Sequence, residues 1–185
     1  TCLLCTLTPP KRVRNLIGAK RSNFYLPGQC LVVDSLILPK SQCRKSAALI
    51  LVDACTGYIS VYPSKDLMAD TAKANITHYL NTHPIPQEIK SDFGSEFQKD
   101  LDTFLAQYNI NLAASKPYSK GSTSQAESAI RLVKEALRQL CLTHTHNWPQ
   151  MIPILLNGLN SQGLYGTTTS RSQIYLSPYS YTNAL

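Results

Sequence analysis

The sequence lacks any apolar run long enough to cross a bilayer, which takes about 20 residues; its longest run, AALILV, covers only residues 47–52. No N-terminal stretch has the charged-then-apolar form of a secretory signal peptide. Acidic residues are also few, because 11 Asp and Glu stand against 18 Lys and Arg, for a net charge of +7. These features predict no association with a membrane. They favour a polyanionic partner, most simply nucleic acid, over a merely solvated basic surface.

A complete set of zinc ligands is missing as well. Among six cysteines, only Cys2 and Cys5 have the Cys-x-x-Cys spacing of half a zinc site. The histidines, at positions 78, 83, 144 and 146, do not supply the other half and are expected at the surface. The chain starts at Thr1 and not at Met. We therefore expect either the end of a zinc module whose other ligands precede Thr1, or an incidental pair. The other four cysteines are expected to be buried free thiols.

The remaining sequence predicts an α/β domain. Residues 1–27 have the mixed composition of a tail and linker. Three consecutive strands are expected, and the break at Gly57 places a hairpin between the second and third. A helix with Asp70 as its N-cap follows, and then strand, helix, strand, helix and helix. In order, the predicted strands and helices cover residues 29–38, 47–56, 58–64, 68–83, 86–92, 95–109, 110–116, 122–144 and 147–161. The Thr-, Ser- and Tyr-rich remainder is expected to be an irregular tail.

Three acidic residues stand out against this background. Asp34 interrupts an apolar strand, Asp92 ends the fourth strand, and Glu127 lies near the start of the long helix. A carboxylate in such a strand is costly unless it is paired or binds a metal; the alternative is an edge strand with one solvated face. If the first and fourth strands are neighbours, the three carboxylates converge, and cations between them would relieve their repulsion. Two magnesium ions held in this way can activate an oxygen that attacks a phosphodiester and stabilise the oxygen that leaves it.

Two further acids have simpler interpretations. Asp53 is expected to cap the hairpin ahead of Gly57 by accepting bonds from backbone amides, with a role near the metals as the alternative. The triplet Asp92-Phe93-Gly94 matches the magnesium-binding triplet of protein kinases. The chain nevertheless lacks the glycine-rich loop and the His-Arg-Asp catalytic loop of a kinase, and it is too short for two kinase lobes.

Four segments, VVDSL, TGYISVYPSKD, IKSDFGSEF and KPYSKGSTSQAESAIRLVKEAL, resemble the catalytic core of retroviral and long-terminal-repeat retrotransposon integrases, which are ribonuclease-H-like DDE recombinases. The resemblance covers about residues 25–180. It implies a five-stranded mixed sheet flanked by helices on both faces. It also implies a remnant of a zinc-binding domain with a basic linker at residues 1–27, a catalytic core at 28–165 and a C-terminal tail at 166–185.

On this resemblance, Asp34, Asp92 and Glu127 are the catalytic residues and hold two Mg²⁺ or Mn²⁺ ions. Zn²⁺ would bind Cys2 and Cys5 only with ligands from upstream. The nucleic-acid-binding positions implied are Lys116, Tyr118, Lys120, Arg131 and Lys134.

The implied function is DNA integration: water trims a DNA 3′ end, and the new 3′ hydroxyl then attacks a target phosphodiester. The implied partners are DNA and further copies of the chain, at least as a dimer. The implied location is intracellular, in the nucleus or in a virus-like particle or preintegration complex. Two alternatives stay open: an integrase-derived DNA-binding protein without catalysis, and a ribonuclease-H-like nuclease that cuts RNA–DNA hybrids.

Overall fold

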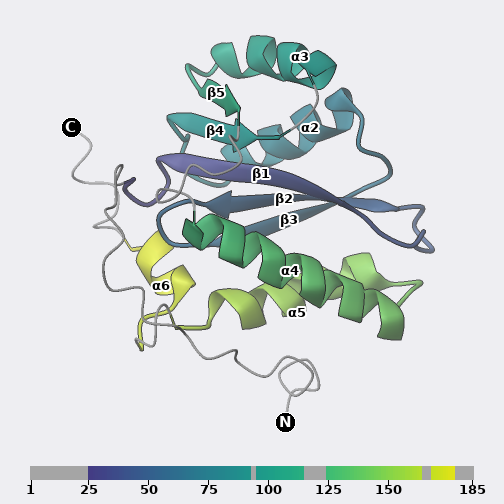
Figure 1. Ribbon diagram of the computed structural model, residues 1–185. Helices are drawn as coiled ribbons and strands as arrows, with labels where there is room; N and C mark the ends of the chain where they lie inside the picture. Colours follow the sequence, from purple (N-terminus) through teal and green to yellow (C-terminus); the bar gives the residue numbers. More distant parts are fainter. Residues whose placement is uncertain (1–24, 93–94, 115–123, 164–167, 178–185) are drawn as a thin grey trace.

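The computed structural model of the chain describes residues 25–92, 95–114, 124–163 and 168–177. Figure 1 shows a sheet with helices above and below it. The strands are β1 (Cys30–Ile37), β2 (Ala47–Asp53), β3 (Ile59–Ser64), β4 (Glu88–Ser91) and β5 (Asn111–Ala114). The helices are α2 (Ala69–Leu80), α3 (Ser95–Ala106), α4 (Ser124–Thr143), α5 (Trp148–Asn160) and α6 (Arg171–Tyr175). The expected five-stranded sheet is confirmed.

The strand order, β3-β2-β1-β4-β5, places β1 at the centre of the sheet. β1, β2 and β3 form the predicted antiparallel meander. β4 pairs in parallel with both β1 and β5. The sheet is therefore mixed, and the first and fourth strands are the neighbours that convergence of Asp34 and Asp92 requires. The hairpin turn contains Gly57 at a φ of +67°, a left-handed conformation that glycine adopts at little cost.

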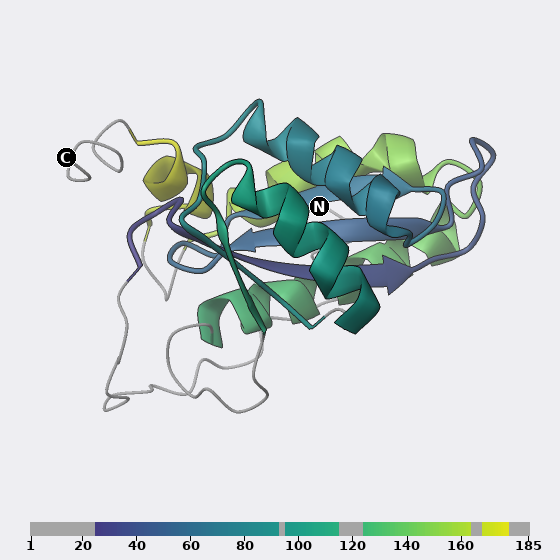
Figure 2. The ribbon, with the colours of Figure 1, turned by 90° about the horizontal axis from the view of Figure 1, so that it is seen from above.

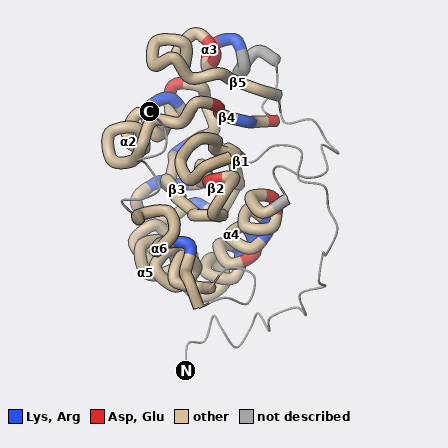
Figure 3. Tube along the Cα trace, turned by 90° about the vertical axis from the view of Figure 1, so that its left-hand side faces the viewer, with Lys and Arg blue, Asp and Glu red and all other residues tan. Residues whose placement is uncertain are grey.

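Both faces of the sheet are apolar, which explains why the β1 sequence does not alternate. Leu31 and Val33 of β1 pack with α2 and α3, whereas Cys30 and Val32 pack with α4 and α5. Seen from above, α2 and α3 lie over the strands (Figure 2). The side view shows α4 and α5 on the opposite side of the sheet from α2 and α3 (Figure 3). Helices on both faces were predicted, and the structure confirms them.

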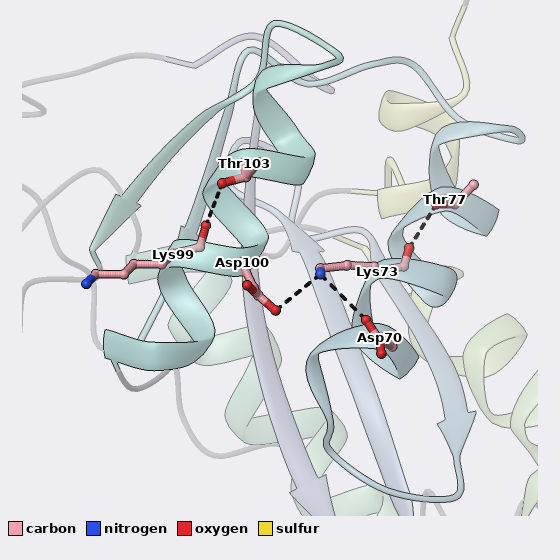
Figure 4. A network of polar contacts seen from close by, with 6 residues as sticks. All are labelled: Asp70, Lys73, Thr77, Lys99, Asp100 and Thr103. Carbon is pink, nitrogen blue, oxygen red and sulfur yellow. Dashed lines mark hydrogen bonds and ion pairs between the residues drawn. The ribbon is translucent and has the colours of Figure 1, made fainter.

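The two helices on one face are also joined by an ion-pair network. Lys73 of α2 lies 3.6 Å from Asp70 on its own helix and 3.4 Å from Asp100 of α3 (Figure 4). The prediction of Asp70 as an N-cap is wrong. Helix α2 has Met68 as its N-cap, without a side-chain cap bond, and Asp70 lies within the first turn. A carboxylate there still interacts favourably with the helix dipole.

The predicted irregular tail is wrong for residues 171–175, which form α6. Ser170 caps this helix through a reciprocal capping box with Gln173. Tyr175 is fully buried, stacks on Tyr58 with ring centroids 4.3 Å apart, and shares a hydroxyl hydrogen bond with Tyr79 of α2. These contacts stabilise the position of a short helix that has no apolar periodicity of its own. Within the described part of the chain, no helix is both long and apolar enough to cross a membrane.

Candidate active site

A hollow of about 350 Å³ opens between the β1 and β4 strands and helix α4. Its lining brings together all three acids singled out from the sequence. The complete set of lining residues is Val32, Val33, Asp34, Asp92, Glu127, Ile130, Arg131, Lys134 and Arg138. Asp34, Asp92 and Glu127 thus line the same hollow, and their roles as catalytic residues and metal ligands stay predictions.

Strand register explains how the two aspartates meet. Val33 of β1 lies opposite Ser91 of β4 in a parallel pair. Asp34 follows Val33 within β1, and Asp92 follows Ser91 directly after the end of β4, so the two aspartates lie at the same level of neighbouring strands. Asp34 itself is paired with Ile50 of β2, in the middle of the sheet. The alternative of a solvated edge strand for Asp34 is therefore excluded.

Helix α4 supplies the third carboxylate and the positive charges. Its buried face, which includes Ala126, Ala129 and Val133, packs in the same apolar core as one face of the sheet. This packing leaves Glu127, in the first turn, and Arg131, one turn later, exposed and facing the hollow. Figure 3 shows acidic and basic residues along the same helix.

Asp34 is held by two contacts, one at each carboxylate oxygen. Its Oδ1 accepts a hydrogen bond from the Ser35 amide at 2.6 Å, and its Oδ2 lies 2.6 Å from the Lys134 Nζ. The Asp34 and Lys134 side chains are 24% and 23% exposed, so this ion pair is partly screened by water. The ammonium compensates the charge that was expected to be costly in a central strand.

The donor set suits a hard divalent cation, because three carboxylates from two strands and a helix open onto one hollow. In the described residues, however, no three His, Cys, Asp or Glu side chains are close enough together to form a ready-made metal cluster. The Lys134 ammonium also contacts the Asp34 Oδ2, at 2.6 Å. The residues fit the metal in type and line one hollow, and to hold the ion Lys134 would withdraw and the carboxylates would move closer together.

Four residues of the lining were not identified from the sequence. Arg138 lies four positions after Lys134 and hence on the same helical stripe, so the spacing could have identified it. It also pairs with Glu135 at 3.9 Å. The other three are the apolar residues Val32, Val33 and Ile130, which the sequence does not distinguish from other core positions. No sequence pattern predicts the Asp34–Lys134 ion pair either.

Asp53 does not reach the hollow. Its carboxylate accepts hydrogen bonds from the Thr56 amide and hydroxyl, each at 2.7 Å, and from the Gly28 amide at 2.8 Å. The predicted hairpin cap is confirmed. Burial raises the pKa of Asp53, and these hydrogen bonds counteract part of that rise.

Several predicted residues lie outside the described part of the chain. They are Cys2, Cys5, Lys116, Tyr118 and Lys120. Their proposed roles in zinc and nucleic-acid binding stay predictions. Of the cysteines that are described, Cys30 and Cys141 are buried free thiols, as expected, whereas Cys43 is exposed. His83 departs from the expectation of a surface residue, because it is half-buried against the Tyr79 ring.

Comparison with known families gives a direct match. The profile of the family described as "Integrase core domain" matches residues 25–120. The Pro-Pol polyprotein of feline foamy virus is 30% identical over 178 residues, which are 94% of this chain and 15% of that protein. The Gag-Pol polyprotein of woolly monkey sarcoma virus is 29% identical over 171 residues, 90% of this chain and 10% of that protein. The chain thus spans a small part of these relatives.

Solved structures give the same fold. The catalytic core domain of BIV integrase superimposes with a TM-score of 0.66 at 18% identity, covering 80% of this chain and 94% of that one. The HTLV-2 integrase catalytic core, solved in complex with magnesium in a dimeric form, gives 0.65 at 20% identity, covering 84% and 100%. This likeness confirms the predicted ribonuclease-H-like fold.

Proposed function

The chain belongs to the integrase core domain family, and from that premise we propose that it is the catalytic core of a retroelement integrase, a metal-dependent polynucleotidyl transferase. The observation that carries this proposal is the hollow that Asp34, Asp92 and Glu127 line together with basic residues of α4. Phosphoryl transfer needs this combination, because carboxylates hold the cations and basic side chains hold the phosphates.

In this proposal Asp34, Asp92 and Glu127 hold two Mg²⁺ or Mn²⁺ ions. When bound, the ions activate the attacking oxygen and stabilise the leaving oxygen of a phosphodiester. Arg131 and Lys134 bind backbone phosphates and orient the reacting bond over the carboxylates. The HTLV-2 core was solved in complex with magnesium, which supports the choice of ion for this chain.

We propose the same reaction course as the sequence resemblance implied. A water molecule first attacks a phosphodiester near a DNA 3′ end and releases the terminal nucleotides. The resulting 3′ hydroxyl then attacks a phosphodiester of the target DNA. One bond forms and one breaks at each step, and no covalent intermediate with the protein is required.

The proposed partners are DNA and further copies of the chain. A net charge of +7 supports a polyanionic partner. Core domains of HTLV-2 integrase were solved in dimeric and trimeric forms, which supports an oligomer of at least two copies. A virus-like particle or preintegration complex, and then the nucleus, is the proposed location. Residues 1–27 are proposed as a zinc-domain remnant and linker, with 28–165 as the core; Cys2 and Cys5 would hold Zn²⁺ only with upstream ligands.

A branched duplex tests this function without knowledge of the element's own ends. A catalyst of strand joining also catalyses the reverse reaction, so the chain should resolve a branched DNA that mimics a joined product. Resolution should require Mg²⁺ or Mn²⁺ and stop on chelation. Cleavage of an RNA–DNA hybrid without resolution of the branch would instead identify the ribonuclease-H-like alternative. Binding of the branch without any reaction would favour the inactive DNA-binding protein.

A further inference from the structure

We propose that Lys134 is a displaceable counter-ion: it holds Asp34 while no metal is bound, and a divalent cation releases it to bind a DNA phosphate. This inference rests on the proposed function. It assigns to Lys134 a positioning role that couples metal binding to DNA binding. The coupling arises because the same ammonium group pairs first with the Asp34 carboxylate and then with a DNA phosphate.

The contact between the two residues is the first support. The Lys134 Nζ lies 2.6 Å from the Asp34 Oδ2, the shortest ion pair in the described part of the chain. The other Asp34 oxygen is already engaged by the Ser35 amide. A metal ion at Oδ2 would lie next to the ammonium, and the repulsion between the two cations favours displacement of the ammonium.

The energetics of the pair make the exchange feasible. Asp34 lies in the central strand, where an uncompensated carboxylate is unfavourable. The pair is nevertheless partly exposed, and such pairs contribute only up to about 1 kcal/mol. A divalent cation offers Asp34 twice the charge of the ammonium and can draw in Asp92 and Glu127 as well. The stronger cation is then expected to displace the weaker.

The released side chain has a second anion within reach. Lys134 lines the same hollow as Arg131, for which binding of a DNA phosphate is proposed. Lysine has a compact charge on a flexible four-carbon stem, so it can turn from the carboxylate to a phosphate without movement of the helix. Arg138 differs in this respect, because it pairs with Glu135 of the same helix, at 3.9 Å.

Competition and coupling follow from this arrangement. Before release, Lys134 competes with the metal for Asp34, so the ammonium weakens metal binding. After release, it strengthens phosphate binding. Metal must therefore raise the affinity for DNA, and DNA must raise the affinity for metal by the same factor. A lysine with a purely structural role would produce neither effect.

The test measures Mg²⁺ binding to the full chain by titration calorimetry, for the wild type, Lys134→Gln and Arg138→Gln. Each variant removes one positive charge from the same helix and the same hollow, but only Lys134 pairs with Asp34. Lys134→Gln should bind Mg²⁺ about fivefold more tightly, the factor that corresponds to an ion pair of about 1 kcal/mol. Arg138→Gln should change the affinity by less than about twofold. If Lys134→Gln did not fold, Lys134→Met, which keeps the unbranched stem, would take its place.

The second readout is binding of a fluorescent non-specific DNA duplex with and without Mn²⁺. Mn²⁺ should tighten binding by the wild type and by Arg138→Gln, and this gain should be clearly smaller in Lys134→Gln, where only the direct interaction between metal and phosphate remains. Equal Mg²⁺ affinities for the wild type and Lys134→Gln would overturn the inference alone, since metal binding itself would persist. Equal tightening in both variants would overturn it too, by showing a long-range charge effect. Failure of every form to bind Mg²⁺ would instead overturn the proposed function, and this inference with it.

Discussion

Asp53 illustrates how much a single buried carboxylate can contribute to this fold. It is 1% exposed and accepts three hydrogen bonds that join the hairpin turn to Gly28. Replacement by alanine leaves buried donors without partners, which costs about 1–3 kcal/mol for each such group. We expect Asp53→Ala to lower the free energy of unfolding by about 3 kcal/mol in urea denaturation.

A matched control for this change is Asp66→Ala. Asp66 also accepts bonds from a backbone amide and a hydroxyl, those of Met68 and Thr71, but it lies nearer the surface. Water can replace it there, so Asp66→Ala should lower the free energy of unfolding much less than Asp53→Ala does. Equal losses for the two variants would show that the burial of Asp53 is not what makes it important.

His83 is expected to make the stability of the folded protein depend on pH. Its ring stacks on Tyr79 with centroids 4.2 Å apart, and burial lowers the pKa of His83 below its ordinary value. The folded state therefore favours the neutral ring. The stability contributed by this group is present above the unfolded pKa of about 6.5 and is lost as the pH falls through the lower folded pKa.

The urea midpoint of the wild type should accordingly fall between pH values of about 7 and about 5. His83→Phe keeps an aromatic ring but has no proton to bind, so its midpoint should fall less. His146→Gln, which changes an exposed histidine, should behave as the wild type does. The same pH dependence in His83→Phe and the wild type would assign the effect to other groups.

At the scale of secondary-structure elements, one side chain joins the end of α5 to the start of the edge strand β3. Asn160 is 4% exposed; its Oδ1 accepts from the Ile59 amide at 2.9 Å, and its Nδ2 donates to the Ile59 carbonyl at 2.8 Å. Asn160→Asp keeps the acceptor but places a buried carboxylate oxygen against a carbonyl. We expect a loss of about 3 kcal/mol of unfolding free energy.

The same substitution three residues earlier provides the comparison. Asn157→Asp changes an exposed position of α5 and should alter the stability by less than about 0.5 kcal/mol. Chemical denaturation of the two variants measures the difference. A loss below about 1 kcal/mol for Asn160→Asp would mean that the α5–β3 connection is held by apolar packing alone.

A second prediction at this scale concerns the contribution of helix α4 to DNA binding. Arg131 and Lys134 lie on the stripe that begins at Glu127 and faces the hollow. The double variant Arg131→Glu with Lys134→Glu should fold, yet bind duplex DNA more weakly by orders of magnitude at low salt. The plot of log affinity against log salt should flatten by about one unit for each phosphate that the variant no longer binds. Fluorescence anisotropy over a salt series measures both quantities.

The control changes the same net charge elsewhere. Lys65→Glu with Lys99→Glu alters two exposed lysines, one just after β3 and one on α3, neither of which lines the hollow. This variant should retain most of its affinity. An unchanged salt slope in the α4 variant would contradict DNA binding at this helix and would favour Lys116 and Lys120 as the phosphate-binding residues.

For the molecule as a whole, the sequence predicted the parts that rest on local pattern. The apolar β1 run and the spacing of helical residues were sufficient to predict the sheet and the helices on its two faces. Asp34, Asp92 and Glu127 could be singled out because they are carboxylates in or beside apolar segments. The Asp34–Lys134 pair could not be predicted, because it joins residues 100 positions apart and depends on how α4 packs on the sheet. Helix α6 was missed because its order comes from the burial of Tyr175 and not from periodicity.

The central claim is that these three carboxylates form a metal-dependent centre for transferring DNA strands. The most direct test is the rate of Mg²⁺-dependent resolution of branched DNA by Asp92→Asn, compared with Asp102→Asn. Both changes replace one exposed carboxylate with its amide, but only Asp92 lines the hollow. We predict a loss of about a thousandfold, or about 4 kcal/mol of transition-state stabilisation, for Asp92→Asn, and a near-wild-type rate for Asp102→Asn. An Asp92→Asn protein that is folded and as fast as the wild type would contradict this claim.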